Sequence, residues 1–155
     1  MADIVVIDDE PRYRRLIAQV LTGAGHEVRQ AGDGAEGLAM CLQRTPQLVI
    51  TDIVMPRMDG YELVRKLRQD ESMSATPVIF CSASYHEREV REMARSLGVR
   101  STLSKPFDLK TVRATVNAAL ATKPSLPTPA QPATTVMGGA QERLSALVTF
   151  SRQIG

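Results

Sequence analysis

The stretch Ile4-Val5-Val6-Ile7-Asp8-Asp9 combines a short run of β-branched apolar residues with two adjacent carboxylates. A run of this length and branching is typical of a strand that is buried on both faces, as in a parallel sheet. Ligand sites in open parallel sheets lie outside the carboxyl ends of the strands. We therefore expect Asp8 and Asp9 to stand at an edge of the sheet where a ligand binds.

Two further stretches repeat this arrangement later in the chain. Leu48-Val49-Ile50-Thr51 is followed by Asp52, and a later strand pattern ends in Leu103-Ser104-Lys105-Pro106. Since parallel strands end at the same edge, three carboxylates and one ammonium are expected to converge there. Three carboxylates in a half-buried pocket repel one another unless a cation is present. Mg²⁺ suits such a set, because it takes one or two carboxylates, a phosphate oxygen and several waters.

The chemistry that this pocket suits is phosphoryl transfer. A carboxylate such as Asp52 can itself be the nucleophile and form an aspartyl-phosphate. Lys105 adds a point charge suited to a phosphoryl oxygen, and Ser82 offers a hydroxyl donor at the end of another predicted strand. Such transfer depends on positioning and on neutralised phosphoryl oxygens more than on a general base.

Strand and helix patterns alternate over the first 122 residues. The predicted strands cover residues 4–7, 26–30, 48–51 and 78–81 and include residues 102 and 103, and the predicted helices begin near residues 11, 35, 60, 87 and 108. This alternation predicts an α/β fold, in which a doubly wound five-stranded parallel sheet has helices on both faces and right-handed crossovers.

Composition limits the remaining choices. The chain has 155 residues, enough for one domain and a tail, and its 43% hydrophobic and 23% charged residues are those of an ordinary globular protein. The sequence has no run of about 18 apolar residues and begins without a secretory signal pattern, so we expect a cytoplasmic protein without membrane insertion. The formal net charge of +2 is not gathered into a basic cluster, and we expect no direct contact with nucleic acid.

The last 33 residues differ from the rest of the chain. Residues 123–139 are rich in Pro, Ala and Thr and are expected to form an extended linker. Residues 140–155 show an amphipathic helical pattern that would be marginally stable alone in water. The segment resembles the opening helix of a GAF-type signalling domain, and we expect the chain to be the N-terminal part of a longer protein. A terminal docking helix, or a homodimer formed through this helix, is the alternative.

Four pieces of the sequence together resemble the receiver domain of bacterial two-component response regulators. They are Asp8-Asp9, the run from Asp52 to Gly60, Ser82-Ala83 and Lys105-Pro106-Phe107, in the order and spacing of that family. The resemblance covers residues 2–122 and implies a flavodoxin-like fold of the receiver type. It also implies a function in phosphorelay signal transduction, in which phosphorylation switches an interaction surface.

The resemblance implies a role for each residue at the phosphoryl site. Asp52 would accept a phosphoryl group from a histidine kinase or a phosphotransfer protein. Lys105 would pair with that group, and Ser82 would turn inward to bond it. The peptide bond between Lys105 and Pro106 is expected to be cis, a conformation that is almost confined to proline.

The same resemblance implies the metal ligands. Asp8 and Asp9 would hold Mg²⁺ directly or through water, and Asp52 with the backbone carbonyl of Val54 would complete the protein ligands. The apolar side chain of Val54 would not orient a water molecule for hydrolysis, which favours a longer-lived phosphoryl state.

One position departs from the family pattern. Receivers usually carry an aromatic residue on the fifth strand, three positions before the lysine, and here Thr102 stands there. An aromatic rotamer switch cannot operate at this position. Either the signal leaves through shifts of a loop and the fourth helix, or the output surface differs. Tyr85, three residues after Ser82, is a candidate substitute ring, although a tyrosine there more often packs at the start of a helix.

Two other functions stay open at this point. One is a receiver-like scaffold that acts without phosphorylation. The other is a Mg²⁺-dependent phosphohydrolase with an aspartyl nucleophile, which the adjacent acids and the lack of a cap segment disfavour, so we expect no enzyme. Cys41 and Cys81 are interpreted as buried reduced thiols, and His26 and His86 as surface residues.

Overall fold

A computed structural model of the chain describes residues 1–83 and 87–121. The predictions for Tyr85 and His86, for the linker at 123–139 and for the helix at 140–155 lie outside the described residues.

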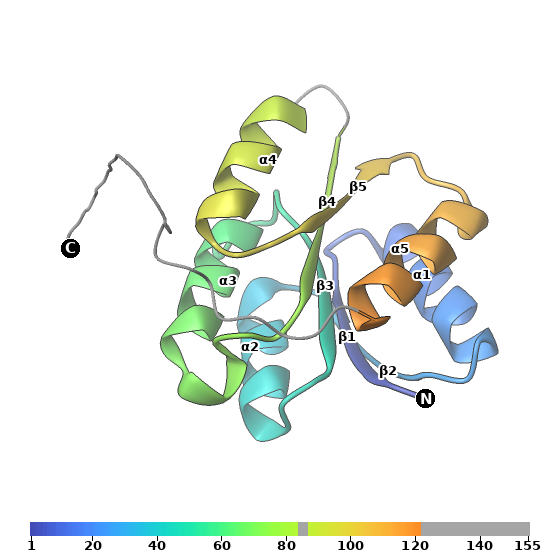
Figure 1. The fold of residues 1–155 in the computed structure, drawn as a ribbon, viewed down its shortest axis with the longest axis horizontal. Coiled ribbons are helices and arrows are strands. Elements are labelled where there is room, and N and C mark those ends of the chain that lie inside the picture. Colours follow the sequence, from blue (N-terminus) through green and yellow to red (C-terminus); the bar gives the residue numbers. More distant parts are fainter. Residues whose placement is uncertain (84–86, 122–155) are drawn as a thin grey trace. The chain divides into compact units, whose positions relative to one another are not determined.

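Strands and helices alternate along the described part of the chain, as the sequence predicts (Figure 1). In chain order the elements are β1 (Asp3–Ile7), α1 (Pro11–Gly23), β2 (Glu27–Ala31), α2 (Gly34–Gln43), β3 (Leu48–Asp52), α3 (Gly60–Gln69), the short 3₁₀-helix η1 (Glu71–Met73), β4 (Val78–Ala83), α4 (Glu87–Ser96), β5 (Ser101–Lys105) and α5 (Leu109–Ala121).

The strands form one parallel sheet in the order β2-β1-β3-β4-β5. Helices α1 and α5 cover one face, and α2, α3 and α4 cover the other (Figure 1). Because successive side chains of a strand point to opposite faces, Ile4 and Val6 pack with α1 and α5, while Val5 and Ile7 pack on the other side. A strand buried on both faces needs apolar residues at every position, which accounts for the unbroken run in β1. The doubly wound prediction is confirmed.

The loops after the strands are short, and carboxylate caps fix where the helices begin. Asp33 Oδ1 accepts a hydrogen bond of 2.8 Å from the backbone N–H of Glu36 at the start of α2. Asp59 accepts one of 2.8 Å from the N–H of Glu62 at the start of α3. Such caps satisfy N–H groups that have no partner within the helix. Each strand end is thereby held close to the helix that follows.

Gly60 shows how closely α3 approaches the end of β3. A Cβ atom at this position would lie 2.5 Å from the carbonyl oxygen of Asp52, so a larger residue does not fit without a backbone shift. The N–H of Gly60 donates to the carbonyl of Ile53 at 2.7 Å. The acceptor strand and the first turn of α3 are therefore in direct backbone contact.

Arg68, near the end of α3, ties three segments together. Its Nε donates to the carbonyl of Leu97 just after α4 at 2.9 Å, and its Nη1 donates to the carbonyls of Met73 at 2.9 Å and Thr76 at 2.8 Å. Burial lowers the pKa of this guanidinium. One side chain of α3 thus donates to carbonyl groups just after α4, at the end of η1 and just before β4.

The interpretations of three single residues agree with the structure. Cys41 and Cys81 are buried free thiols, as expected. His26 is partly exposed at the surface, as expected, and its Nδ1 also accepts a hydrogen bond of 3.1 Å from the N–H of Ala2. The imidazole therefore secures the start of the chain beside β2.

Candidate functional site

Three carboxylates lie together at the carboxyl edge of the sheet. Asp8 and Asp9 follow β1, and Asp52 is the last residue of β3; one oxygen from each side chain lies within 4.8 Å of the others. Asp8 is 1% exposed and Asp52 is 8% exposed, while Asp9 faces solvent. The convergence that the strand endings predict is confirmed. Hard oxygen donors at this spacing are suited to a divalent cation.

The backbone holds one oxygen of each buried carboxylate. Asp8 Oδ1 accepts a hydrogen bond of 2.8 Å from the N–H of Glu10, and Asp52 Oδ1 accepts one of 2.9 Å from the N–H of Ile53. The other oxygens face Lys105, whose Nζ lies 3.2 Å from Asp8 Oδ2 and 3.4 Å from Asp52 Oδ2. The two Oδ2 atoms thus face the ammonium and not the backbone.

Asp8 Oδ2 is fully buried and, among the described residues, receives no hydrogen bond of good geometry. The nearby Lys105 ammonium gives it an ion pair at 3.2 Å instead. Buried oxygens are rarely left without a donor or a metal ion. This oxygen and its two neighbouring carboxylates fit a bound Mg²⁺ ion.

The pKa values report the same excess of negative charge. Burial raises the pKa of Asp52 to about 6, and the neighbouring charge of Asp8 adds to this, while Lys105 and the Ile53 N–H act in the opposite direction. Burial also raises the pKa of Asp8. For Lys105, burial would lower the pKa, but the charges of Asp52 and Asp8 outweigh it and raise the pKa. The pocket therefore favours added positive charge.

The other residues expected at the site lie on neighbouring segments. Ser82 is buried on β4, one residue beyond Cys81, which pairs with Asp52 in the sheet. The Lys105–Pro106 peptide bond is cis, as expected. Val54 follows β3 in the loop before α3, and its side chain is 76% exposed. Thr102 is half-buried on β5, beside Phe80 of β4.

Two residues of α1 also reach the site, and the sequence analysis did not identify them. The ring centroid of Tyr13 lies 4.4 Å from Lys105 Nζ. Arg14 donates to the backbone carbonyl of Asp8 at 2.8 Å. The sequence offers only a weak signal for them: Pro11 begins the helix directly after the acidic loop, but no pattern indicates which side chain of its first turns reaches the lysine.

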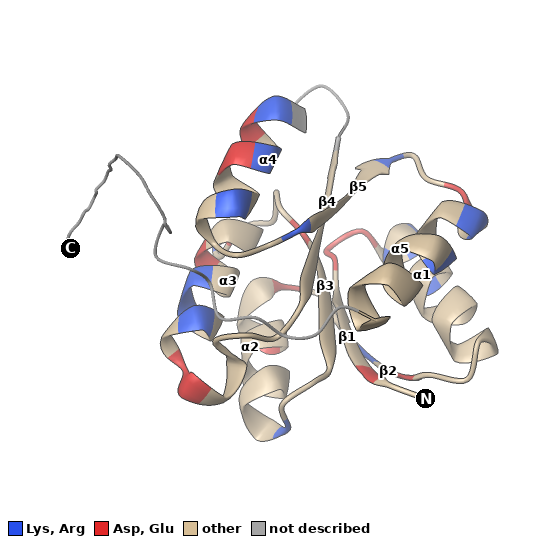
Figure 2. Ribbon diagram, viewed as in Figure 1, with Lys and Arg blue, Asp and Glu red and all other residues tan. Residues whose placement is uncertain are grey.

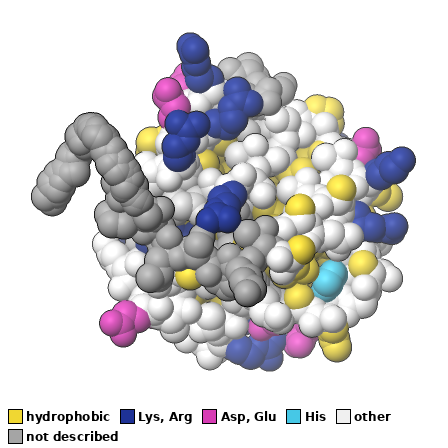
Figure 3. All heavy atoms as spheres, in the orientation of Figure 1, with side chains coloured by type: hydrophobic (Ala, Val, Ile, Leu, Met, Phe, Trp, Pro, Cys, Tyr) yellow, Lys and Arg dark blue, Asp and Glu magenta, His cyan; other side chains and the backbone are white. Residues whose placement is uncertain are grey.

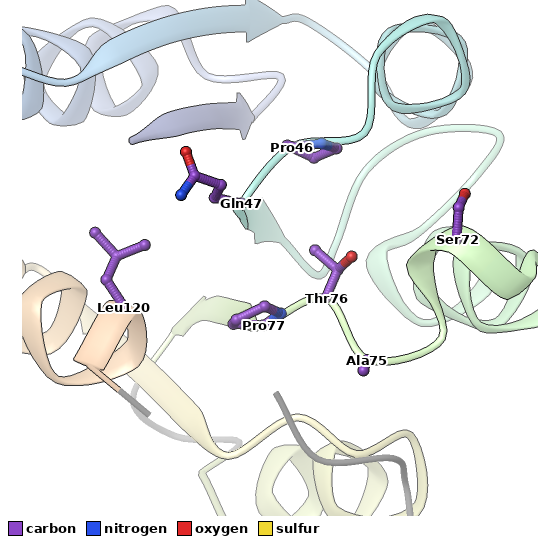
Figure 4. A pocket seen from close by; sticks show the side chains of 7 residues that line it. All are labelled: Pro46, Gln47, Ser72, Ala75, Thr76, Pro77 and Leu120. Atoms are coloured by element: carbon purple, nitrogen blue, oxygen red, sulfur yellow. The ribbon is translucent and has the colours of Figure 1, made fainter. Parts of the chain in front are cut away.

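A surface hollow of about 320 Å³ lies at the opposite edge of the sheet, where β3 and β4 begin (Figure 4). None of the side chains that line it is ionisable, so it has no part in charge neutralisation. Its lining residues are Pro46, Gln47, Ser72, Ala75, Thr76, Pro77 and Leu120.

Charged residues of both signs alternate along α4, whereas α3 carries one acidic residue, Glu62, followed by three basic residues (Figure 2). On the face seen in Figure 3, several Lys and Arg side chains gather over α4 beside an acidic one, and other basic side chains lie singly. A nucleic-acid binder usually carries a continuous basic stripe. This face has none.

Comparison with known proteins identifies the family. The sequence model of the response regulator receiver domain matches residues 4–117. The chain belongs to this family. Its relatives include the protein PilH of Pseudomonas aeruginosa, to which this receiver is 36% identical over 121 residues, covering 78% of this chain and 99% of PilH. A second relative is the sensor histidine kinase RcsC of Escherichia coli, 36% identical over 114 residues, which are 73% of this chain and 12% of RcsC.

Solved structures agree with the receiver assignment. The chemotaxis protein CheY4 of Vibrio cholerae superposes with a TM-score of 0.73 at 29% identity, covering 77% of this chain and 98% of CheY4. The receiver domain of NtrX from Brucella abortus gives a TM-score of 0.72 at 32% identity, covering 78% of this chain and all of that domain. The receiver-type fold is thus confirmed. Within the described residues, no helix is both long and apolar enough to cross a membrane.

Proposed function

We propose that this receiver is the phosphoacceptor of a two-component phosphorelay. Asp52 takes a phosphoryl group from a histidine kinase or a phosphotransfer protein, with Mg²⁺ as the cofactor. The observation that carries the proposal is the environment of Asp52 Oδ2, which is buried at the end of β3, 3.4 Å from an ammonium and beside two further carboxylates. A carboxylate in that setting is a nucleophile that already has one cation for the incoming phosphoryl group, the Lys105 ammonium, beside it.

The steps assigned to Asp52 and Lys105 use atoms that the structure already places beside one another. Asp52 Oδ1 stays on the Ile53 N–H, so Oδ2 attacks phosphorus as the bond between phosphorus and the donor's leaving nitrogen or oxygen breaks. The Lys105 ammonium then pairs with a phosphoryl oxygen, and the Ser82 hydroxyl donates to another. When bound by Asp8, Asp9, Asp52 and the Val54 carbonyl, Mg²⁺ supplies charge neutralisation for the transferred group.

The first experiment is phosphorylation by a small donor. We expect incubation with Mg²⁺ and acetyl phosphate or phosphoramidate to add the mass of one phosphoryl group to the intact protein. The isosteric variant Asp52→Asn should remain unmodified, as should the wild-type protein in EDTA. A folded wild-type protein that binds Mg²⁺ and takes up no phosphoryl group from either donor would contradict the proposal and favour a phosphorylation-independent scaffold.

We further propose that the chain is not an enzyme. A phosphohydrolase would release inorganic phosphate from a phosphate ester over many turnovers, whereas an acceptor forms one adduct per protein. Incubation with p-nitrophenyl phosphate and Mg²⁺ separates the two, because sustained release of p-nitrophenol would support the hydrolase.

The output is proposed to leave through α4 rather than through a ring on β5. Thr102 has no aromatic ring to rotate, and Ser82 lies at the end of the strand that leads toward α4. Hydrogen exchange with and without the phosphoryl group tests this: the largest change should fall in α4, and a change centred on β5 and α5 would refute it. The cytoplasmic location and the linker and helix after residue 122 stay predictions.

A further inference from the structure

The Lys105 ammonium has three N–H donors, and the two carboxylates lie on only part of its surface. Asp8 Oδ2 and Asp52 Oδ2 are 3.2 Å and 3.4 Å away. The ring of Tyr13 lies on a further side, with its centroid 4.4 Å from Nζ. The lysine side chain is only 16% exposed. A ring face thus takes a place where an exposed ammonium would contact water.

The Tyr13 ring is itself held in position. Its centroid lies 5.4 Å from that of Phe107, at an interplanar angle of 56°, within the usual range for attractive aromatic pairs. Phe107 lies two residues after Lys105, so the ring from α1 contacts two side chains of the same short segment. The first turn of α1 and the end of β5 are therefore linked through this ring.

We propose that Tyr13 is a positioning residue that acts through Lys105, holding the ammonium where it meets the phosphoryl group. The inference rests on the phosphoacceptor function proposed above. Its physical basis is the difference between the contacts of Nζ. Any cation that binds Asp8 and Asp52 shares their charge and weakens their hold on Lys105, whereas the attraction of a ring face for an ammonium does not depend on carboxylate charge.

The first test compares two substitutions. Tyr13→Leu removes the ring face and should lower the second-order rate constant for phosphorylation by phosphoramidate about 5- to 30-fold, which corresponds to a half-buried cation–π contact. Tyr13→Phe keeps the ring and should stay within roughly twofold of wild type. Both rates are measured well below the unfolding temperature of each variant, so that a loss of stability does not lower the folded fraction.

The second test does not require phosphorylation. Protons held over an aromatic face resonate upfield, so the Lys105 methylene groups nearest Nζ should show shifted NMR signals in the wild-type protein and in Tyr13→Phe. The shift should disappear in Tyr13→Leu. If the wild-type protein took up no phosphoryl group, the proposed function would fail, while this measurement would still test the contact.

Three results would overturn the inference. One is a wild-type rate for Tyr13→Leu, which would mean that the ring does not influence Lys105 during transfer. Another is an equal loss in Tyr13→Phe, which would assign the effect to the hydroxyl group. The third is the absence of any upfield shift at Lys105 in the wild-type protein.

Discussion

Replacing Asp52 with asparagine should stabilise the folded protein at neutral pH when no divalent cation is present. The pKa of Asp52 is raised from 3.8 to about 6, mainly by burial and then by the charge of Asp8. One pKa unit corresponds to about 1.4 kcal/mol, so the ionised carboxylate costs about 3 kcal/mol of unfolding free energy. Asparagine keeps an oxygen for the Ile53 N–H and carries no charge.

The pH dependence follows from the direction of this pKa change. The unfolded chain loses the proton near pH 4, and the folded protein loses it near pH 6. Between these values the folded state binds more protons than the unfolded state, so the unfolding free energy of the wild-type protein falls as the pH rises from 4 to 6. The unfolding free energy of the wild-type protein stays at this lower level above pH 6. The advantage of Asp52→Asn is therefore largest above pH 6 and vanishes near pH 4.

Urea denaturation in EDTA at pH 4, 5, 6 and 7.5 measures this difference. Asp9→Asn is the matched control, because it removes an exposed carboxylate of the same cluster and should change the cation-free stability little. With Mg²⁺ present the stability gain of Asp52→Asn should shrink, since an ion that binds only the folded state stabilises the wild-type ligand set more than that of the variant. A gain as large at pH 4 as at pH 7.5, or no gain at pH 7.5, would refute the reasoning.

Three further substitutions test other parts of the structure. Lys105→Met should strengthen Mg²⁺ binding, because it removes the cation that the metal must displace from Asp52. Calorimetry measures the affinity, and weaker binding by the variant would show that the lysine orients the carboxylates. Arg68→Ala should lower the unfolding free energy in urea by about 3 kcal/mol, since three carbonyls lose a charged donor, and a loss below about 1 kcal/mol would mean that water replaces it. Gly60→Ala should lower the unfolding free energy in urea by about 2 kcal/mol and slow phosphorylation, because its Cβ would meet the Asp52 carbonyl. The control is Gly23→Ala, whose Cβ meets nothing within 4 Å and which should leave the unfolding free energy unchanged or raise it slightly.

The parts of the fold that the sequence predicts well are those with a strong one-dimensional signal. Residues 4–7 of β1 and 48–50 of β3 are apolar and buried, and the aspartates Asp8 and Asp52 mark where these strands end. β5 gives a weaker signal, because it is an edge strand in which only Leu103 is buried. The sequence accordingly predicted residues 102 and 103, while the strand runs from Ser101 to Lys105.

The residues of the candidate site also differ in how well the sequence predicts their positions. Asp8, Asp52 and Lys105 could be placed together because the carboxyl ends of parallel strands share one edge. The contact between Tyr13 and Lys105 could not, since it depends on how α1 leans over the end of β5, which no periodicity records. The hydrogen bond from the Ala2 N–H to His26 could not be predicted either, because it also depends on how distant segments pack. Contacts between elements distant in sequence need the packed structure.

The hydrogen bond from Arg68 holds the C-terminal end of α4 in place. The carbonyl of Leu97, just beyond the last turn of the helix, is held to α3 by the guanidinium, whereas the other end of the helix follows the strand that carries Ser82. A movement of Ser82 that is passed to α4 would therefore rotate the helix about its C-terminal end. The displacement would be greatest near Glu87 and smallest near Ser96. A partner that binds the first turns of α4 would meet a surface that moves by the full displacement, whereas a partner that binds the last turn would meet a surface that hardly moves.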